Sequence, residues 1–104
     1  MAAGPMKMRA TANGGVTEIR VLMTHPMETG QRKDQDGKIV PSHFIQNIAV
    51  KMNGQTVVDS QISQAISRNP VFTFRLKGGS KGDRIEVSWL DNKGETNSTE
   101  AAVA

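Results

Sequence analysis

One block of the chain, His25–Asp34 (HPMETGQRKD), gathers several kinds of chemically active side chain within ten residues. It combines an imidazole, a thioether, carboxylates and cations, which is more than a connecting turn requires. The 104 residues include no cysteine. Disulfides, thiolate nucleophiles and cysteine-ligated metals are therefore excluded, and function must come from recognition or from a partner's chemistry.

A copper site is the first chemical reading of the block. Met23, His25 and Met27 alternate at an expected strand end, and thioether and imidazole ligands suit Cu(I). Met23, however, shares its parity with Ile19 and Val21, so we expect it in the core. Met27 then fills a gap and His25 is a hydrogen-bonded loop residue. A stand-alone periplasmic module that binds copper through Met23, His25 and Met27 is kept as the alternative.

Catalysis is the second reading, because His25 titrates near neutrality and Asp34, Asp36 and Asp59 supply carboxylates. No nucleophile elbow, phosphate loop or paired-carboxylate pattern accompanies them. Ser42 and His43 are adjacent, so in a strand they point to opposite faces. We predict that the chain alone is not an enzyme.

The charge distribution favours a docking surface. The formal net charge is +3, and cations dominate residues 68–84 whereas carboxylates dominate residues 86–104. Basic residues are not interleaved with aromatics in the way that single-strand binding requires. We therefore expect contact with protein partners and not with nucleic acid.

Period-two alternation predicts about seven short strands, joined by turns of the Asn-Gly and Gly-rich kind. The expected strands are 6–12, 17–24, 44–52, 55–58, 72–76, 85–89 and 95–103. Residues 59–68 have apolar spacing typical of a short helical or irregular crossover, and Trp89 shares its parity with core residues. The fold class is an all-β, immunoglobulin-like antiparallel β-sandwich, with the last strand at an edge.

Length and hydropathy predict one domain over residues 1–104. Residues 1–5 are expected to be disordered or left over from cloning. No apolar run resembles a secretory signal or a membrane span. The chain is expected to have no signal of its own and no membrane contact.

Two stretches resemble the SoxZ family. The first runs from His25–Asp34 through Gly37–Pro41 and His43–Ile45 to Lys51–Gly54. The second contains Asn69-Pro70, Phe72–Phe74, Lys77–Gly79, Lys81–Asp83 and Val87–Gly94. The resemblance covers roughly residues 7–103, which is nearly the whole chain.

The resemblance implies an immunoglobulin-like scaffold without cofactor that pairs as a heterodimer with SoxY. In that family SoxY carries thiosulfate-derived sulfur on a C-terminal cysteine arm and presents it to the Sox enzymes, which contact the carrier transiently. It also implies a periplasmic location, reached by folded co-export with a partner that bears a twin-arginine signal. Without SoxY, self-association is possible. An adhesion-type immunoglobulin domain is a third reading, for which the sequence shows neither secretion signal nor tandem neighbours.

Partner contacts are expected on charged loops. The residues chosen for this role are His25, Met27, Glu28, Arg32, Lys33, Asp34, Lys77, Lys81 and Asp91. Arg32, Lys33 and Lys38 are also candidates for contact with an anion carried on the cysteine arm of SoxY. Loops on rigid sandwiches commonly carry recognition, which supports the group as a whole.

Overall fold

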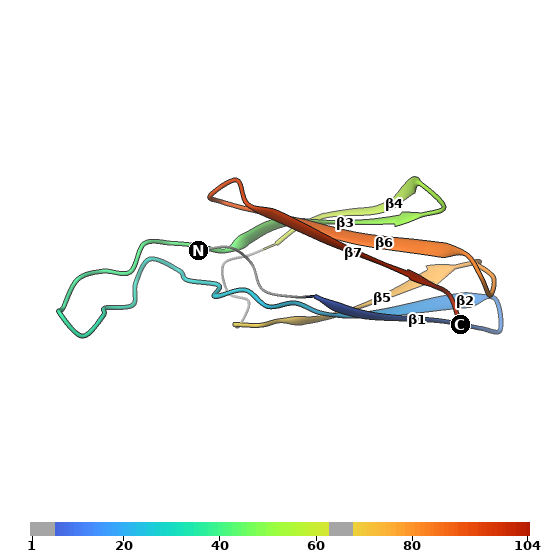
Figure 1. Ribbon diagram of the computed structural model, residues 1–104, viewed down its shortest axis with the longest axis horizontal. Helices are drawn as coiled ribbons and strands as arrows, with labels where there is room; N and C mark the ends of the chain where they lie inside the picture. Colours follow the sequence, from blue (N-terminus) through green and yellow to red (C-terminus); the bar gives the residue numbers. More distant parts are fainter. Residues whose placement is uncertain (1–5, 63–67) are drawn as a thin grey trace.

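The computed structural model describes residues 6–62 and 68–104, and these residues form two antiparallel sheets packed face to face (Figure 1). One sheet has the strand order β1-β2-β5 and the other β4-β3-β6-β7. The strands are β1 (Lys7–Asn13), β2 (Val16–Leu22), β3 (Ile45–Met52), β4 (Gln55–Gln61), β5 (Val71–Lys77), β6 (Arg84–Asp91) and β7 (Thr96–Ala102). The predicted all-β, immunoglobulin-like sandwich is confirmed.

Alternating burial explains why these segments are strands. In β2, Thr17, Ile19 and Val21 are fully buried while their neighbours are exposed. In β6 the same alternation buries Ile85, Val87 and Trp89. Successive side chains of a strand point to opposite faces, so each sheet contributes one apolar face to the core. The expectation that Trp89 belongs to the core is confirmed, since it is 2% exposed.

Turn chemistry sets the strand pairing. Asn53 and Gly54 both have positive φ and join β3 to β4, as the Asn-Gly signal predicts. Residues 92–95 join β6 to β7, which lies at an edge of its sheet as expected. The C-terminus also ties the two sheets together, because Ala104 exchanges backbone hydrogen bonds with Ala10 and Ala12.

One predicted element is wrong in part. Asp59 was assigned to a short helical or irregular crossover, but residues 59–61 continue strand β4 and pair with β3. The pairing with Asn47, Ile48 and Ala49 extends the hairpin beyond the apolar run, and main-chain hydrogen bonds carry it. Residues 63–67 of the expected crossover, like residues 1–5, lie outside the described residues.

A long connection between β2 and β3 projects from one end of the sandwich (Figure 1). We call residues 28–43 the arm. The molecule measures 52 × 21 × 21 Å and its radius of gyration is 15.3 Å. A compact chain of this length has a radius of gyration of roughly 13 Å, so the arm makes the molecule elongated.

Candidate functional site: a buried histidine-aspartate network beneath the arm

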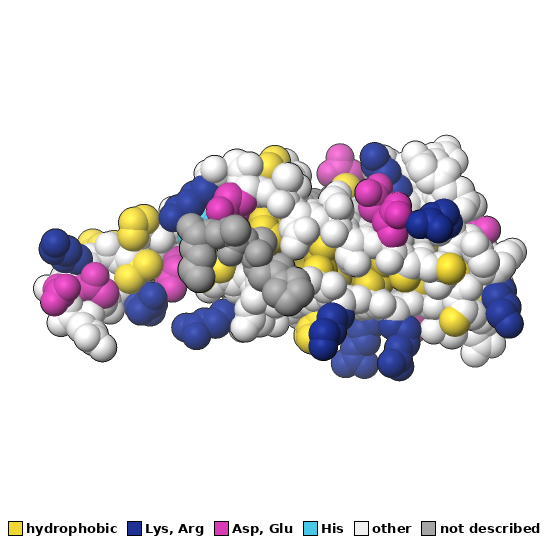
Figure 2. All heavy atoms as spheres, viewed as in Figure 1, with side chains coloured by type: hydrophobic (Ala, Val, Ile, Leu, Met, Phe, Trp, Pro, Cys, Tyr) yellow, Lys and Arg dark blue, Asp and Glu magenta, His cyan; other side chains and the backbone are white. Residues whose placement is uncertain are grey.

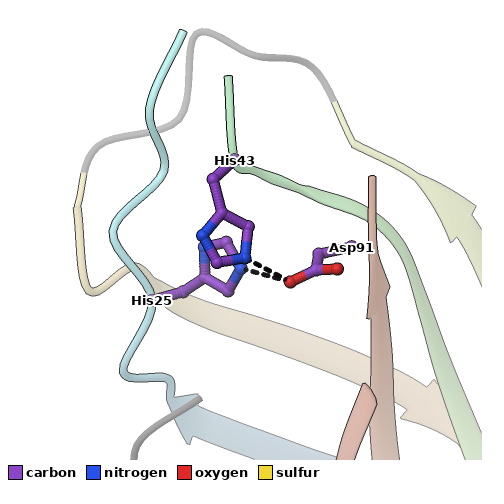
Figure 3. Close-up of side chains that lie close together, drawn as sticks. All are labelled: His25, His43 and Asp91. Atoms are coloured by element: carbon purple, nitrogen blue, oxygen red, sulfur yellow. Dashed lines mark hydrogen bonds and ion pairs between the residues drawn. The ribbon is translucent and has the colours of Figure 1, made fainter. Parts of the chain in front are cut away.

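Three ionisable side chains meet at the base of the arm. His25 follows β2, His43 precedes β3 and Asp91 ends β6 (Figure 3). Asp91 Oδ2 lies 3.1 Å from His25 Nε2 and 2.6 Å from His43 Nε2. All three residues are buried. Strands from both sheets therefore bring together residues that are far apart in the sequence.

Trp89 and the second histidine enclose His25. The His25 ring meets the indole of Trp89 edge to face, at a centroid distance of 5.0 Å, and the His43 ring at 4.5 Å. Such edge contacts add about 0.5–1.5 kcal/mol beyond burial of area. They also hold the imidazole plane in one orientation toward Asp91.

The backbone decides the tautomer of His25. The Met27 N–H donates to His25 Nδ1 at 3.1 Å, so Nδ1 has a lone pair and the ring proton lies on Nε2. Nε2 then donates to Asp91. Burial lowers the pKa of His25, and this outweighs the hydrogen bond that His25 donates to Asp91, which acts in the opposite direction. His25 is therefore a neutral donor at neutral pH.

Asp91 is the acceptor at the centre of the network. Its Oδ1 accepts the backbone N–H groups of Lys93 and Glu95 at 3.0 and 2.8 Å, which shapes the β6–β7 turn. Burial alone would raise the pKa of Asp91, but the hydrogen bonds from His25, from backbone N–H groups and from His43 together lower it. The carboxylate is thus ionised and fully engaged.

Glu95 adds a second carboxylate beside His43. Its Oε1 lies 2.8 Å from His43 Nε2, but that nitrogen carries one proton, directed at Asp91. Among the described residues Glu95 Oε1 consequently has no hydrogen-bond donor, although it is buried. Since one N–H cannot point at both carboxylates, the donor on His43 Nε2 serves Asp91, which lies closer, at 2.6 Å.

The network has the residue types of a metal site, since ligand atoms of His25, His43 and Asp91 lie within 4.8 Å of one another. The hydrogen bonds argue against that use. A metal on His25 Nε2 would move the ring proton to Nδ1, where the Met27 N–H already donates. The arrangement therefore fits a hydrogen-bonded support for the arm better than a metal centre.

The copper reading loses its support for the same reason. Met23 lies in the hydrophobic core, as its strand parity predicts. The Met27 sulfur accepts the Ile45 N–H at 3.4 Å, and both nitrogens of His25 have partners. Copper binding by Met23, His25 and Met27 would require these bonds to break.

Met27 shows how tightly the base of the arm is held. Its φ is +49°, a left-handed backbone conformation that residues other than glycine rarely adopt. Two hydrogen bonds hold Met27 in this conformation. Its N–H donates to His25 Nδ1, and its sulfur accepts the N–H of Ile45. The strain lies beside the network, where the chain leaves the sandwich for the arm.

The two halves of the arm are joined by isolated β-bridges and single backbone hydrogen bonds. Glu28 and His43 exchange backbone hydrogen bonds of 2.7 and 2.8 Å, and the Val40 N–H donates to the Arg32 carbonyl. At the tip, Asp34 Oδ1 accepts the N–H groups of Asp36 and Lys38. The tip is therefore a structured turn that presents charged side chains to solvent.

The expected partner residues divide into two groups. His25, Met27 and Asp91 are buried and support the arm from inside the sandwich, so their contact with a partner stays a prediction. Arg32, Lys33, Asp34, Lys77 and Lys81 are exposed, and Glu28 is half-buried. Lys77 and Lys81 lie on the β5–β6 side, away from the arm.

Glu28 and Arg32 form a bidentate pair along the arm. The guanidinium donates to both carboxylate oxygens at 2.7–3.1 Å. The hydrogen bonds from Arg32 lower the pKa of Glu28 and raise that of Arg32. Arg32 is thus already paired, which leaves Lys33 and Lys38 as the arm cations without an ion pair among the described residues.

Sequence reasoning missed the network itself. The sequence does not link these residues, because Asp91 lies 66 positions from His25 and 48 positions from His43. The sequence suggests Asp91 only as a partner-contact residue, not as the acceptor of two histidines. The signal available was a pair of histidines placed beside predicted strand ends, which does not by itself say that they converge.

Comparison with solved structures defines the class of fold. A hypothetical protein from Pyrococcus horikoshii matches with TM-score 0.67 at 14% identity, covering 98% of this chain and 89% of that one. A superoxide reductase (neelaredoxin) from Archaeoglobus fulgidus matches with TM-score 0.64 at 17% identity, covering 99% and 91%. The chain thus shares the sandwich fold of these proteins. These identities show the fold alone.

The family follows from the sequence match. The model of the sulphur oxidation protein SoxZ matches residues 6–102, so the chain belongs to the SoxZ family and has a role in Sox sulphur oxidation. The resemblance recognised in the motifs is confirmed. A search of the curated proteins found none that matches. Within the described residues, no helix has the length and apolar character needed to cross a membrane.

Proposed function

We propose that this chain is the non-catalytic subunit of a periplasmic sulfur carrier, in which it pairs with SoxY. SoxY would supply the C-terminal cysteine that holds thiosulfate-derived intermediates. The observation that carries the proposal is the family match over residues 6–102. The absence of cysteine from all 104 residues supports it, because this chain has no thiol to bear sulfur.

The chemistry of the buried network supports a non-catalytic role. A general base needs a free lone pair within reach of a substrate proton. His25 Nδ1 is occupied by the Met27 N–H, and its Nε2 proton is bound to Asp91. Both groups are also sealed from solvent. In this proposal His25 holds the base of the arm and does not act on a substrate.

The arm is our candidate for contact with the partner or with visiting enzymes. It projects from the sandwich (Figure 1) and ends in a turn with exposed Lys33, Asp34 and Lys38. Ile39, which is 60% exposed, adds an apolar side chain beside them. An apolar anchor with a charged rim is the composition expected of a protein interface.

Co-purification with a SoxY-like protein tests the proposal. We expect a stable heterodimer by size-exclusion chromatography with light scattering. Ile39→Asp should weaken it about tenfold or more if the arm lies in the interface, whereas Val57→Asp, at an exposed site on β4, is the matched control. Failure of the parent chain to form any heterodimer would refute the central claim.

A further inference from the structure

The outer face of the β1-β2-β5 sheet is exposed and strongly basic. Pairing across the strands places Lys7 beside Leu22 and Val71, Arg9 beside Arg20 and Thr73, and Thr11 beside Glu18 and Arg75. Every outward side chain of the three strands is exposed. We call this surface the basic face.

The charge of the molecule is concentrated there. The basic face carries Lys7, Arg9, Arg20, Arg75 and Lys77 against a single carboxylate, Glu18. Its formal charge is therefore +4, whereas the whole chain is +3, so the remaining surface is slightly negative. Figure 2 shows Lys and Arg side chains gathered along the side where Figure 1 draws the three-stranded sheet. Separation of this kind orients an approaching anionic partner.

Two arginine side chains at the centre of the basic face repel each other, which destabilises the fold when no partner covers them. Arg9 and Arg20 are directly opposite each other in the ladder, and like charges at such positions are destabilising. Among the described residues Glu18 pairs with Arg75 at 3.2 Å, and neither Arg9 nor Arg20 has an ion pair. An acidic group between the two guanidinium groups would relieve the repulsion.

The shape and chemistry of the basic face favour a protein surface over a small anion. An open groove of about 590 Å³ is lined by Lys7, Met8, Arg9, Arg20 and Leu22. Leu22 and Val71 are nearly half exposed beside it. A small oxyanion calls for converging donors in an enclosed site, whereas cations spread along an open groove with apolar neighbours match an interface. The inner-facing Phe72 and Phe74 offer no stacking platform for nucleic acid.

We propose that the basic face docks an acidic segment of a visiting partner protein, with carboxylates between Arg9 and Arg20 and apolar side chains against Leu22 and Val71. The identity of the visitor as an enzyme served by the carrier rests on the proposed function. The docking surface lies on a sheet face and is separate from the arm.

An acidic peptide of the sequence EELEEDLEE is a suitable probe, titrated into the ¹⁵N-labelled chain and followed by NMR. We expect saturable shifts at residues 7–9, 20–22 and 71–73, which weaken steeply as salt rises from about 0.05 to about 0.5 M. Arg9→Glu combined with Arg20→Glu should weaken binding about tenfold or more. The double variant Lys33→Glu and Lys38→Glu makes the same change of charge on the arm and should bind the peptide as the parent does.

Other results would overturn the assignment. Equal loss of binding in both double variants would mean that only net charge matters. Sulfate that produces the same saturable shifts would make the groove a small-anion site, and tighter binding of a single-stranded oligonucleotide would make it a nucleic-acid site. If the glutamate variant does not fold, Arg9→Gln with Arg20→Gln replaces it. Pairing with a SoxY-like protein is scored separately, so loss of the heterodimer and loss of peptide binding are distinguishable.

Discussion

At the scale of single residues, Asp91 is the group on which the base of the arm depends. One carboxylate accepts from His25, which precedes the arm, from His43, which ends it, and from two backbone N–H groups of its own turn. Each hydrogen bond to a charged group contributes about 1.5–3 kcal/mol. Because the carboxylate is buried, nothing in the solvent can replace it when it is changed.

Asp91→Asn tests this dependence. The amide loses the charge and turns an N–H donor toward donors already present, so we expect the free energy of unfolding to fall by about 3 kcal/mol or more. Urea denaturation followed by Trp89 fluorescence measures it. Asp59→Asn, at an exposed position on β4, should change stability by no more than about 0.5 kcal/mol. Equal effects of the two substitutions would contradict the role of Asp91.

The neutral state of His25 makes stability depend on pH. Burial lowers its pKa from the ordinary 6.5. As the pH falls below about 6.5, His25 therefore binds a proton in the unfolded chain before it does so in the folded chain. Stability should therefore fall on acidification from about pH 6.5, by at most about 1.4 kcal/mol per pH unit for this group. Asp91, with its lowered pKa, adds a further loss of the same sign at lower pH, below its ordinary 3.8.

Unfolding free energies at pH 8 and pH 5 check the sign, with His25→Gln as the comparison. The glutamine cannot titrate, so the variant should be less stable at pH 8 but lose less stability between the two pH values than the parent does. A parent that gains stability at pH 5, or a variant that loses as much as the parent, would show that His25 is not the group responsible.

At the scale of elements, the turn between β5 and β6 is held against the sandwich by Gly79. The Thr17 hydroxyl is buried and donates to the Gly78 carbonyl at 2.8 Å. A Cβ on Gly79 would lie 2.0 Å from Thr17 Oγ1. The close approach needs a glycine for space as well as for its φ of +87°.

Gly79→Ala should therefore destabilise the protein more than Gly78→Ala. The two glycines have nearly the same φ, +87° and +85°, but a Cβ on Gly78 meets nothing within 4 Å. We expect about 1–2 kcal/mol from the left-handed backbone in each variant, and about 1–3 kcal/mol more from the clash at Gly79. Thermal denaturation of both variants gives the difference, and equal melting temperatures would refute the clash.

At the scale of the whole molecule, the two contact regions that we propose lie apart from each other. The arm extends from one end of the sandwich, and the basic face covers the outside of one sheet (Figures 1 and 2). The sandwich core contains no cysteine and does not depend on a redox environment. A rigid body with two separate contact regions is suited to holding one protein while meeting another.

Replacement of the arm separates these roles. Glu28 and His43 are paired across a backbone bridge, so an Asn-Gly turn can join them without residues 29–42. We expect the shortened chain to fold with native Trp89 fluorescence, to have a radius of gyration nearer to about 13 Å by X-ray scattering, and to bind the acidic peptide like the parent. Loss of the heterodimer alone would place the arm at the SoxY interface, and an unfolded shortened chain would show that the arm is part of the core.

Much of the fold could be predicted because a strand with one buried face has alternating apolar and polar residues in its local sequence. Alternation in residues 17–23 and 85–89 and the Asn53-Gly54 turn depend only on neighbours along the chain. Residues 59–61 were misassigned because their pairing comes from main-chain hydrogen bonds with β3, which leave little mark on side-chain pattern. The SoxZ motifs similarly identify the family from short runs of sequence.

The site could be predicted only in part. Sequence patterns are enough to show that the chain has no thiol, that Met23 and Trp89 belong to the core, and that charged residues flank His25. The convergence of His25 and His43 on the buried Asp91 carboxylate, and the pairing of Arg9 with Arg20 across a ladder, appear only in the folded chain. The reason is physical: strand alternation is local, but which strands become neighbours depends on the packing of the two sheets.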